Sequence, residues 1–365
     1  MLERGVAEKV FPAAQAVVIQ AGKTAFEGAA GDASLETVFD LASLTKILCT
    51  TALFMTGWEK GELAPTDSLR DLLYHRSGLP AFLPFFEGAL RAFPELIQAT
   101  CASEIRNRAR QRVIEEAKLQ HPLARAGVVT RYSDIGFILL GDQLERRLGK
   151  RLDALFLERI GRPLGLGARF RPLEGPQNLD APYRIAPTGR IRPRPPAPGQ
   201  EGLWNIQVQA PSPAGEVDDD NAWAMGGVAG HAGLFGTAWD LAKFGQAVLE
   251  DLEGAGRMAS SAIWRQAIQV DSTLPGSTRA LGFDTPNRTG TSSAGRLLGN
   301  GPLGAVGHLG FTGVSLWIDL SRQLVVALCS NRTYLGRDNL LIHSFRPRFH
   351  DAAVRELEPS PSRKT

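Results

Sequence analysis

Two β-rich segments at opposite ends of the chain constrain its fold more than any other feature. Residues 14–31, AQAVVIQAGKTAFEGAAG, contain two apolar runs around the turn-forming AGK. Residues 313–331, GVSLWIDLSRQLVVALCSN, repeat this pattern around DLSRQ. We expect two hairpins that share one antiparallel sheet, which would bring the two ends of the chain together.

Helical patterns fill the chain between these segments. Ser133 and Asp134 are good N-cap residues for an apolar run that ends at Gly149. Pro347 weakens the middle of the last helical pattern. The expected helices start near Leu44 and at residues 102–120, 133–149, 237–252 and 341–357.

Residues 186–205, APTGRIRPRPPAPGQEGLWN, are dense in proline and arginine. Proline fixes φ and cannot donate a backbone hydrogen bond, so we expect an extended connection rather than a helix or strand. It is either a surface loop between subdomains or a loop that borders a binding site. Trp204 and Trp223 are candidates for lining a cleft, with a place in the core as the alternative.

Composition excludes several classes of protein. The 365 residues include 41 basic and 38 acidic side chains, and this near balance gives no reason to expect nucleic acid as a partner. Three separated cysteines without CxxC or Cys-His clusters predict neither a disulfide framework nor a zinc site. No signal peptide or membrane-spanning run is evident, so we expect a cytoplasmic protein with no membrane contact, or a periplasmic one if the chain has been shortened.

The stretch FDLASLTK, residues 39–46, places Ser43 and Lys46 three apart at an expected helix start. Both side chains would then project from one face of the helix. A serine attacks only when something takes its proton, and a desolvated lysine can help because burial favours its neutral form. The alternative is a serine N-cap followed by a solvated lysine.

Two more short stretches carry residues that handle protons. Tyr132, in RYSDIGF, is either a packing residue or a general base if its phenolate lies near an ammonium group. The segment GHLGFTG, residues 307–313, has four glycines, which indicate close approach of the backbone. His308 within it is a proton donor, a recognition group or a structural histidine.

Together these motifs resemble, in order and spacing, those of the serine β-lactamase and penicillin-binding-protein superfamily. They are similar above all to the branch of class C β-lactamases, DD-peptidases and esterases. Two flanking segments, LLYHRSGLP and DNAWAMGGVAGHAGLFGTAWDLAKF, look like the same family, and the resemblance runs from about Phe11 to Asn331. The three motifs are SLTK at 43–46, YSD at 132–134 and HLG at 308–310.

The resemblance implies an α/β (α+β) fold, in which an antiparallel sheet is flanked by helices and joined to a mainly helical subdomain. We expect a single β-lactamase-like domain over residues 1–365. Its α/β part would occupy about 1–66 and 215–365, and its helical part about 67–214. The chemistry of this family implies no metal and no other cofactor.

The resemblance also implies roles for individual residues. Ser43 would form the acyl-enzyme, Lys46 would tune the site, and Tyr132 would take the serine proton. The backbone N–H groups of Ser43 and Phe311 would form an oxyanion hole. The residues expected to bind the substrate are Asp134, His308, Leu309, Gly310 and Phe311.

Two positions depart from the family pattern. Asp134 stands where asparagine is common, and an ionised aspartate only accepts hydrogen bonds. It either holds the Lys46 ammonium, which leaves the base role to Tyr132, or caps a helix away from the substrate. Leu309 stands where a hydroxyl would help to bind a substrate carboxylate, so the site favours neutral or apolar acyl groups.

These observations lead to a serine hydrolase that cleaves an ester, a β-lactam or a D-amino-acid peptide through an acyl-serine intermediate. The alternative is a non-enzymatic penicillin-recognition or scaffold protein with the same fold, which the substitutions at Asp134 and Leu309 would suit. His231 and His75 are interpreted as structural residues rather than as bases.

Overall fold

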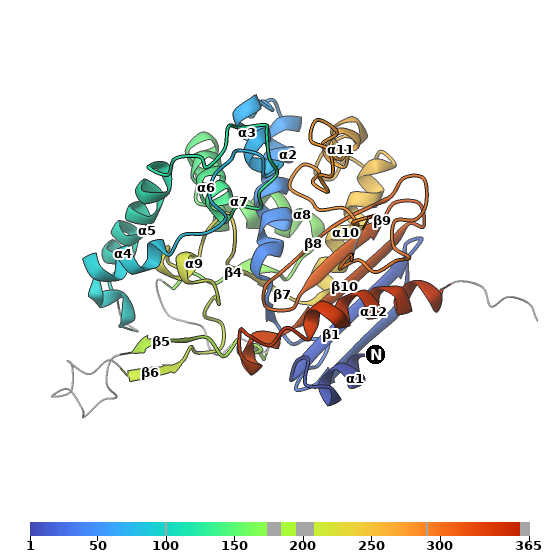
Figure 1. Cartoon of the computed structure of the whole chain (residues 1–365), viewed down its shortest axis with the longest axis horizontal. Coiled ribbons are helices and arrows are strands. Elements are labelled where there is room, and N and C mark those ends of the chain that lie inside the picture. Colours follow the sequence, from blue (N-terminus) through green and yellow to red (C-terminus); the bar gives the residue numbers. More distant parts are fainter. Residues whose placement is uncertain (99–100, 174–183, 195–207, 290, 358–365) are drawn as a thin grey trace, which may run out of the picture.

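The computed structural model describes residues 1–98, 101–173, 184–194, 208–289 and 291–357. At its centre lies a five-stranded antiparallel sheet with the order β2-β1-β10-β9-β8 (Figure 1). The two expected hairpins are confirmed, and they join where β1 pairs with β10. The strands are β1 (Ala13–Gln20), β2 (Lys23–Gly31), β8 (Ala305–Leu309), β9 (Ser315–Asp319) and β10 (Leu324–Ser330).

Helices cover both faces of this sheet because its strands are apolar on both sides. In β10, Val326 and Leu328 pack into the cluster formed with α12 (Ile342–Arg355) and α1 (Leu2–Ala7). The alternate residue Val325 packs on the opposite face, where α10 (Ala238–Leu252) lies. Figure 1 shows α12 and α1 over one face of the sheet.

A mainly helical region lies beside the sheet (Figure 1). The expected helices are confirmed, and Ser133 caps α6 by accepting a hydrogen bond from Gly136 N at 3.1 Å. The expected weakness at Pro347 is wrong, because α12 runs continuously through it. The helices of this region are α2 (Ala52–Glu59), α3 (Asp67–Leu73), α4 (Phe85–Ala92), α5 (Ser103–Lys118), α6 (Asp134–Leu148), α7 (Leu152–Phe156), α8 (Arg162–Leu164) and α9 (Asp220–Ala224), and α11 (Ser261–Ala267) lies nearer the sheet.

Part of the proline- and arginine-rich stretch forms a paired strand. This corrects the expectation that the stretch would be an extended connection without a strand. β5 (Ile191–Arg194) pairs with β6 (Val208–Pro211) in a two-stranded ribbon. A proline is tolerated in such a ribbon because each of its strands has an open edge. Trp204 lies outside the described residues, whereas Trp223 is only 2% exposed and belongs to the core.

The observed architecture confirms the expected fold class, an antiparallel sheet flanked by helices with a mainly helical region. The proposed division into 1–66 with 215–365 and 67–214 stays a prediction. Within the described part of the chain, no helix combines the length and the apolar character needed to cross a bilayer. The three cysteines are free thiols.

Candidate active site

Ser43 lies in a strained turn between the short strand β3 (Phe39–Asp40) and the helices that follow. Ala42, directly before it, has a positive φ of 45° although it is not glycine. Asp40 fixes this turn, because one carboxylate oxygen accepts from Ala42 N at 2.8 Å and the other from Asp218 N at 2.7 Å. Strain held by surrounding hydrogen bonds is common at functional sites.

Lys46 begins a widened helical segment, Lys46–Thr51, that continues into α2. Its side chain is fully buried, so the alternative of a solvated lysine is wrong. Its Nζ donates to Ser43 Oγ at 2.9 Å and to the carbonyl of His231 at 3.0 Å, and lies 2.7 Å from Asp134 Oδ1. The turn of Ser43 has no side-chain cap, so the N-cap interpretation of this serine is also wrong.

The Asp134 carboxylate therefore holds the lysine ammonium. This is one of the two roles that the sequence suggested for Asp134, the other being a helix cap. Burial alone would lower the pKa of Lys46, but Asp134 and Tyr132 raise that pKa above its usual value. The alternative role of Asp134, as the helix cap, belongs instead to Ser133.

Tyr132 lies over the Lys46 ammonium, with 5.0 Å between Nζ and the centre of its ring. The ring also packs against His75, with 4.6 Å between the ring centres, and against His308, with 5.8 Å. Burial raises the pKa of the Tyr132 hydroxyl, although the Lys46 charge and hydrogen bonds to Lys46 and Ser43 oppose this effect. Lys46 and Tyr132 thus both hold their protons at neutral pH.

The third motif lies at the end of β8, beside Tyr132. His308 Nδ1 lies 2.7 Å from the carbonyl of Leu309, the only acceptor that could fix its tautomer among the described residues. Burial, together with the charges of Lys46 and Arg279, holds the pKa of His308 well below its usual value, so this histidine is neutral. It supplies no positive charge for binding an anion.

The Phe311 N–H, expected as a donor of the oxyanion hole, has no acceptor among the described residues. The carbonyl of Gly310 accepts from Arg346 at 2.6 Å. In a trans peptide the N–H points opposite to the carbonyl, so the N–H of Phe311 faces away from Arg346.

The motifs meet in a cleft of about 460 Å³ that also contains charges that the sequence analysis missed. Arg337 pairs with Asp218 at 2.6 Å, and Asp220 is bound by Arg190 at 2.6 Å. The run of three aspartates at residues 218–220, where α9 begins, was the available signal. The cleft is lined by Ala42, Ser43, Phe82, Tyr132, Asp134, Asp218, Asp219, Asp220, Ala232, Leu309, Gly310, Phe311, Arg332, Arg337, Leu340, Ile342, His343 and Arg346.

His231 and His75 contact residues of the site and hold them in place. His231 Nε2 lies 2.9 Å from Asp219, and its carbonyl accepts from Lys46. His75 Nδ1 accepts from Ser133 N at 3.1 Å and its ring packs on Tyr132. Both positions fit the structural role that was expected. Among the residues that the structure describes, no group of three or more histidines, cysteines or acids could hold a metal ion.

Comparisons with known proteins agree with this geometry. The chain is 28% identical to the N-acetylmuramyl-L-alanine amidase of Bacillus subtilis (strain 168), covering 92% of this chain and 80% of that protein. It is 27% identical to a putative D-alanyl-D-alanine carboxypeptidase of Escherichia coli O157:H7, covering 83% and 70%. The octameric penicillin-binding protein homologue from Pyrococcus abyssi has a similar fold, with a TM-score of 0.67 at 18% identity over 97% of this chain and 75% of that one.

The sequence also matches the family described as beta-lactamase over residues 1–344, which is nearly its whole length. The order of the SLTK, YSD and HLG motifs and their convergence in one cleft fit that match. This chain belongs to the beta-lactamase family.

Proposed function

We propose that the protein is a serine hydrolase that cleaves an ester or amide bond through an acyl intermediate on Ser43. The observation that carries this proposal is the contact between Ser43 Oγ and the buried Lys46 Nζ at 2.9 Å, with Tyr132 beside both. A nucleophile in contact with a base that a third group orients is the usual arrangement for covalent catalysis. A site that had lost its chemistry would be expected to lack at least one of these three groups.

In the proposed reaction, Ser43 Oγ attacks the carbonyl carbon of the substrate while its proton passes to the Lys46–Tyr132 pair. The carbonyl oxygen becomes an oxyanion, which the N–H groups of Ser43 and Phe311 would stabilise. The pair then gives the proton to the leaving alcohol or amine. Water repeats the same steps on the acyl-serine and releases the acid.

The pair must lose a proton before it can accept one. Because Lys46 and Tyr132 both have raised pKa values, the competent form becomes more abundant as the pH rises. We therefore propose that turnover is low in acid and increases into the alkaline range.

Neutral acyl substrates suit the cleft best. Leu309 offers no donor, and His308 is uncharged. The cleft cations are occupied by the protein itself, since Arg332 donates to the carbonyl of Phe311 at 2.8 Å and Arg337 pairs with Asp218. An added carboxylate would have to compete with these contacts, so we propose that neutral esters are cleaved faster than β-lactams.

A second candidate is the hydrolysis of amide bonds in D-amino-acid peptides. It is favoured by the names of the two relatives, an amidase and a putative carboxypeptidase. It is also favoured by Arg337, whose side chain is 39% exposed in the cleft and could turn from Asp218 to a peptide carboxylate.

The test is a substrate panel measured with the wild type and Ser43→Ala. The panel contains p-nitrophenyl butyrate, nitrocefin and an N-acylated peptide that ends in two D-alanines. We expect Ser43→Ala to lower kcat/KM on the best substrate by about 10⁴-fold or more. Ser344→Ala, at an exposed serine of α12, is the matched control.

Equal activity in the wild type and Ser43→Ala would refute the proposal. Stoichiometric labelling of Ser43 by a penicillin without turnover of any substrate would support a binding protein instead. Faster cleavage of the peptide than of the ester would select the second candidate.

A further inference from the structure

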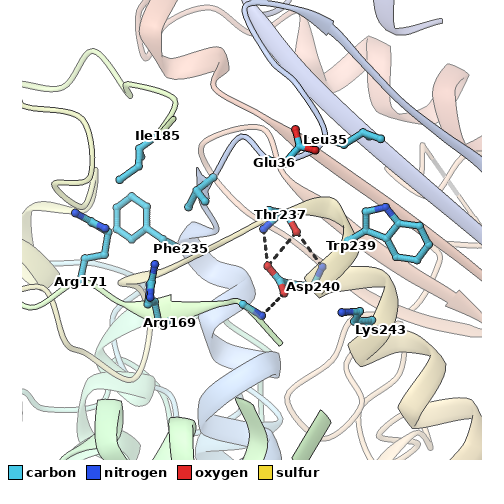
Figure 2. Close-up of a pocket in the computed structure, with 12 residues that line it drawn as sticks. Leu35, Glu36, Arg169, Arg171, Ile185, Phe235, Thr237, Trp239, Asp240 and Lys243 are labelled. Atoms are coloured by element: carbon cyan, nitrogen blue, oxygen red, sulfur yellow. Dashed lines mark hydrogen bonds between the residues drawn. The ribbon is translucent and has the colours of Figure 1, made fainter. Parts of the chain in front are cut away.

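A second pocket, of about 350 Å³, lies apart from the cleft and shares no lining residue with it. Figure 2 shows its lining side chains. They come from β4 (Arg169–Phe170) and the residues on either side of it, from β7 (Leu234–Gly236) and the start of α10, from the loop before β3, and from Ile185. Its residues are Leu35, Glu36, Val38, Gly167, Arg169, Arg171, Ile185, Phe235, Thr237, Trp239, Asp240 and Lys243.

Two arginines occupy one side of this pocket without a counter-charge. Arg169, in β4, and Arg171, two residues further along the chain, lie on the same side of the pocket beside Phe235 (Figure 2). Within the described ranges, the side chain of neither arginine forms an ion pair or hydrogen bond with the protein. Arg171 Nε is shielded from solvent and has no acceptor among these residues. Burial and the nearby charge of Arg169 lower the pKa of Arg171. No acidic side chain opposes this lowering, which agrees with the lack of a counter-charge.

The acids of the pocket do not neutralise these arginines. Asp240 is engaged in capping α10, where it accepts from Thr237 N at 2.9 Å, and it also accepts from Gly167 N at 2.6 Å (Figure 2). Glu36 is exposed and accepts from Ser34 at 2.8 Å. Lys243 adds a third positive charge, and its Nζ donates to the carbonyl of Gly165 at 3.1 Å.

The rest of the wall is apolar. Phe235 is 1% exposed and forms the floor beside Val38 and Ile185. Trp239 lies on the far side, and its indole N–H already donates to Glu27 at 2.9 Å, so it offers the pocket a flat apolar surface. A buried donor left without a partner destabilises the folded protein, and a suitable acceptor would remove that cost. An arginine fork presents paired donors that match a carboxylate or a phosphate.

We propose that this pocket binds a small organic anion, with its carboxylate or phosphate on Arg169 and Arg171 and its apolar body on Phe235, Ile185 and Trp239. The site is independent of the reaction proposed at Ser43. Its ligand is defined by one oxyanion group and one flat or branched apolar part.

The experiment measures calorimetric binding and the shift in Tm with benzoate, phenyl phosphate, inorganic phosphate and the neutral analogue benzamide. We expect benzoate or phenyl phosphate to bind at one site with a Kd of about 1 mM or below, and benzamide to bind at least about tenfold more weakly. A preference for benzoate assigns a carboxylate ligand, whereas a preference for phenyl phosphate assigns a phosphate ligand. Added salt should weaken binding, because the arginines are partly exposed.

Arg169→Gln, Arg171→Gln and the double variant test the location of the site. The double variant should lose at least about tenfold in affinity for the better probe. Arg184→Gln is the matched control, because that arginine lies beside Ile185 but is paired with Asp32 at 3.1 Å outside the pocket. It should bind the probe like the wild type.

Folding provides an independent readout. Because removing one of two adjacent like charges relieves repulsion, Arg169→Gln should keep or raise the Tm without ligand, whereas an arginine that only packs would lower it. The exposed Arg169→Gln variant also keeps the test valid if the double variant does not fold. Unchanged affinity in the arginine variants would place the probe outside this pocket and overturn the proposal. Absence of binding up to about 10 mM, or equal binding of benzamide, would overturn it too.

Discussion

The cleft of Ser43 and the pocket of Arg169 and Arg171 treat positive charge in opposite ways. In the cleft of Ser43, the buried Lys46 is surrounded by acceptors of the chain itself, namely Ser43, the carbonyl of His231 and Asp134. In the second pocket, Arg171 keeps a shielded donor with no acceptor among the described residues. The first site is electrostatically complete without a ligand, whereas the second is completed only when an anion enters. The complete cluster therefore points to proton transfer within the protein, whereas the incomplete one points to an anion that comes from outside.

The strongest test of the complete cluster is Tyr132→Phe. This change removes the hydroxyl that would carry the serine proton and keeps the ring that packs on His75. We expect kcat/KM for the best substrate to fall by about 10²- to 10⁴-fold with little change in Tm. Tyr74→Phe, at a buried tyrosine outside the cleft, is the control and should keep full activity. A loss below about threefold would remove Tyr132 from the proton path.

Asp134→Asn removes the counter-charge from the cluster and tests the pH dependence. The carboxylate of Asp134 raises the pKa of Lys46, so the base form of Lys46 appears only at high pH. Without the carboxylate this pKa falls, and the rising limb of kcat/KM against pH should move to lower pH. Activity at neutral pH would then increase relative to the alkaline plateau. The measurement is a pH–rate profile of the ester substrate for both proteins.

Asp67→Asn, in the first turn of α3, is the surface control for this profile. In Asp134→Asn the rising limb of kcat/KM against pH could also stay in place or move to higher pH. Either result would show that Lys46 is not part of the titrating base. If kcat/KM falls at every pH and the pH–rate profile keeps its position, Asp134 would instead be assigned to the binding of the substrate.

The smallest expected effect is that of Leu309→Thr, which adds one donor to the cleft. A single hydrogen bond has a net value of about 1 kcal/mol, so kcat/KM for nitrocefin should improve by about fivefold relative to the ester. Leu340→Thr changes an exposed leucine that also lines the cleft and serves as the control. An unchanged ratio in Leu309→Thr would mean that this position does not select against carboxylates.

Much of the fold could be predicted from the sequence because the signals are local. The hairpin at 14–31 follows from strand-forming residues around a turn, and Ala21 and Gly22 do adopt the positive φ that such a turn requires. The cap of Ser133 on α6 and its end at Gly149 follow from the same kind of short-range pattern. The ribbon of β5 and β6 was missed because its pairing partner comes later in the chain than the proline-rich stretch itself.

The sequence by itself determined the three motifs and therefore the identity of Ser43, Lys46 and Tyr132 as candidates. Only the tertiary structure decided their charge states, because these depend on groups that are distant in the chain. Lys46 donates to a carbonyl 185 residues away, and its pKa depends on Asp134. The second pocket carries no motif at all. Its unpaired arginines become visible only when four separate segments pack together, since burial and the absence of an acceptor are properties of the packing and not of the residue.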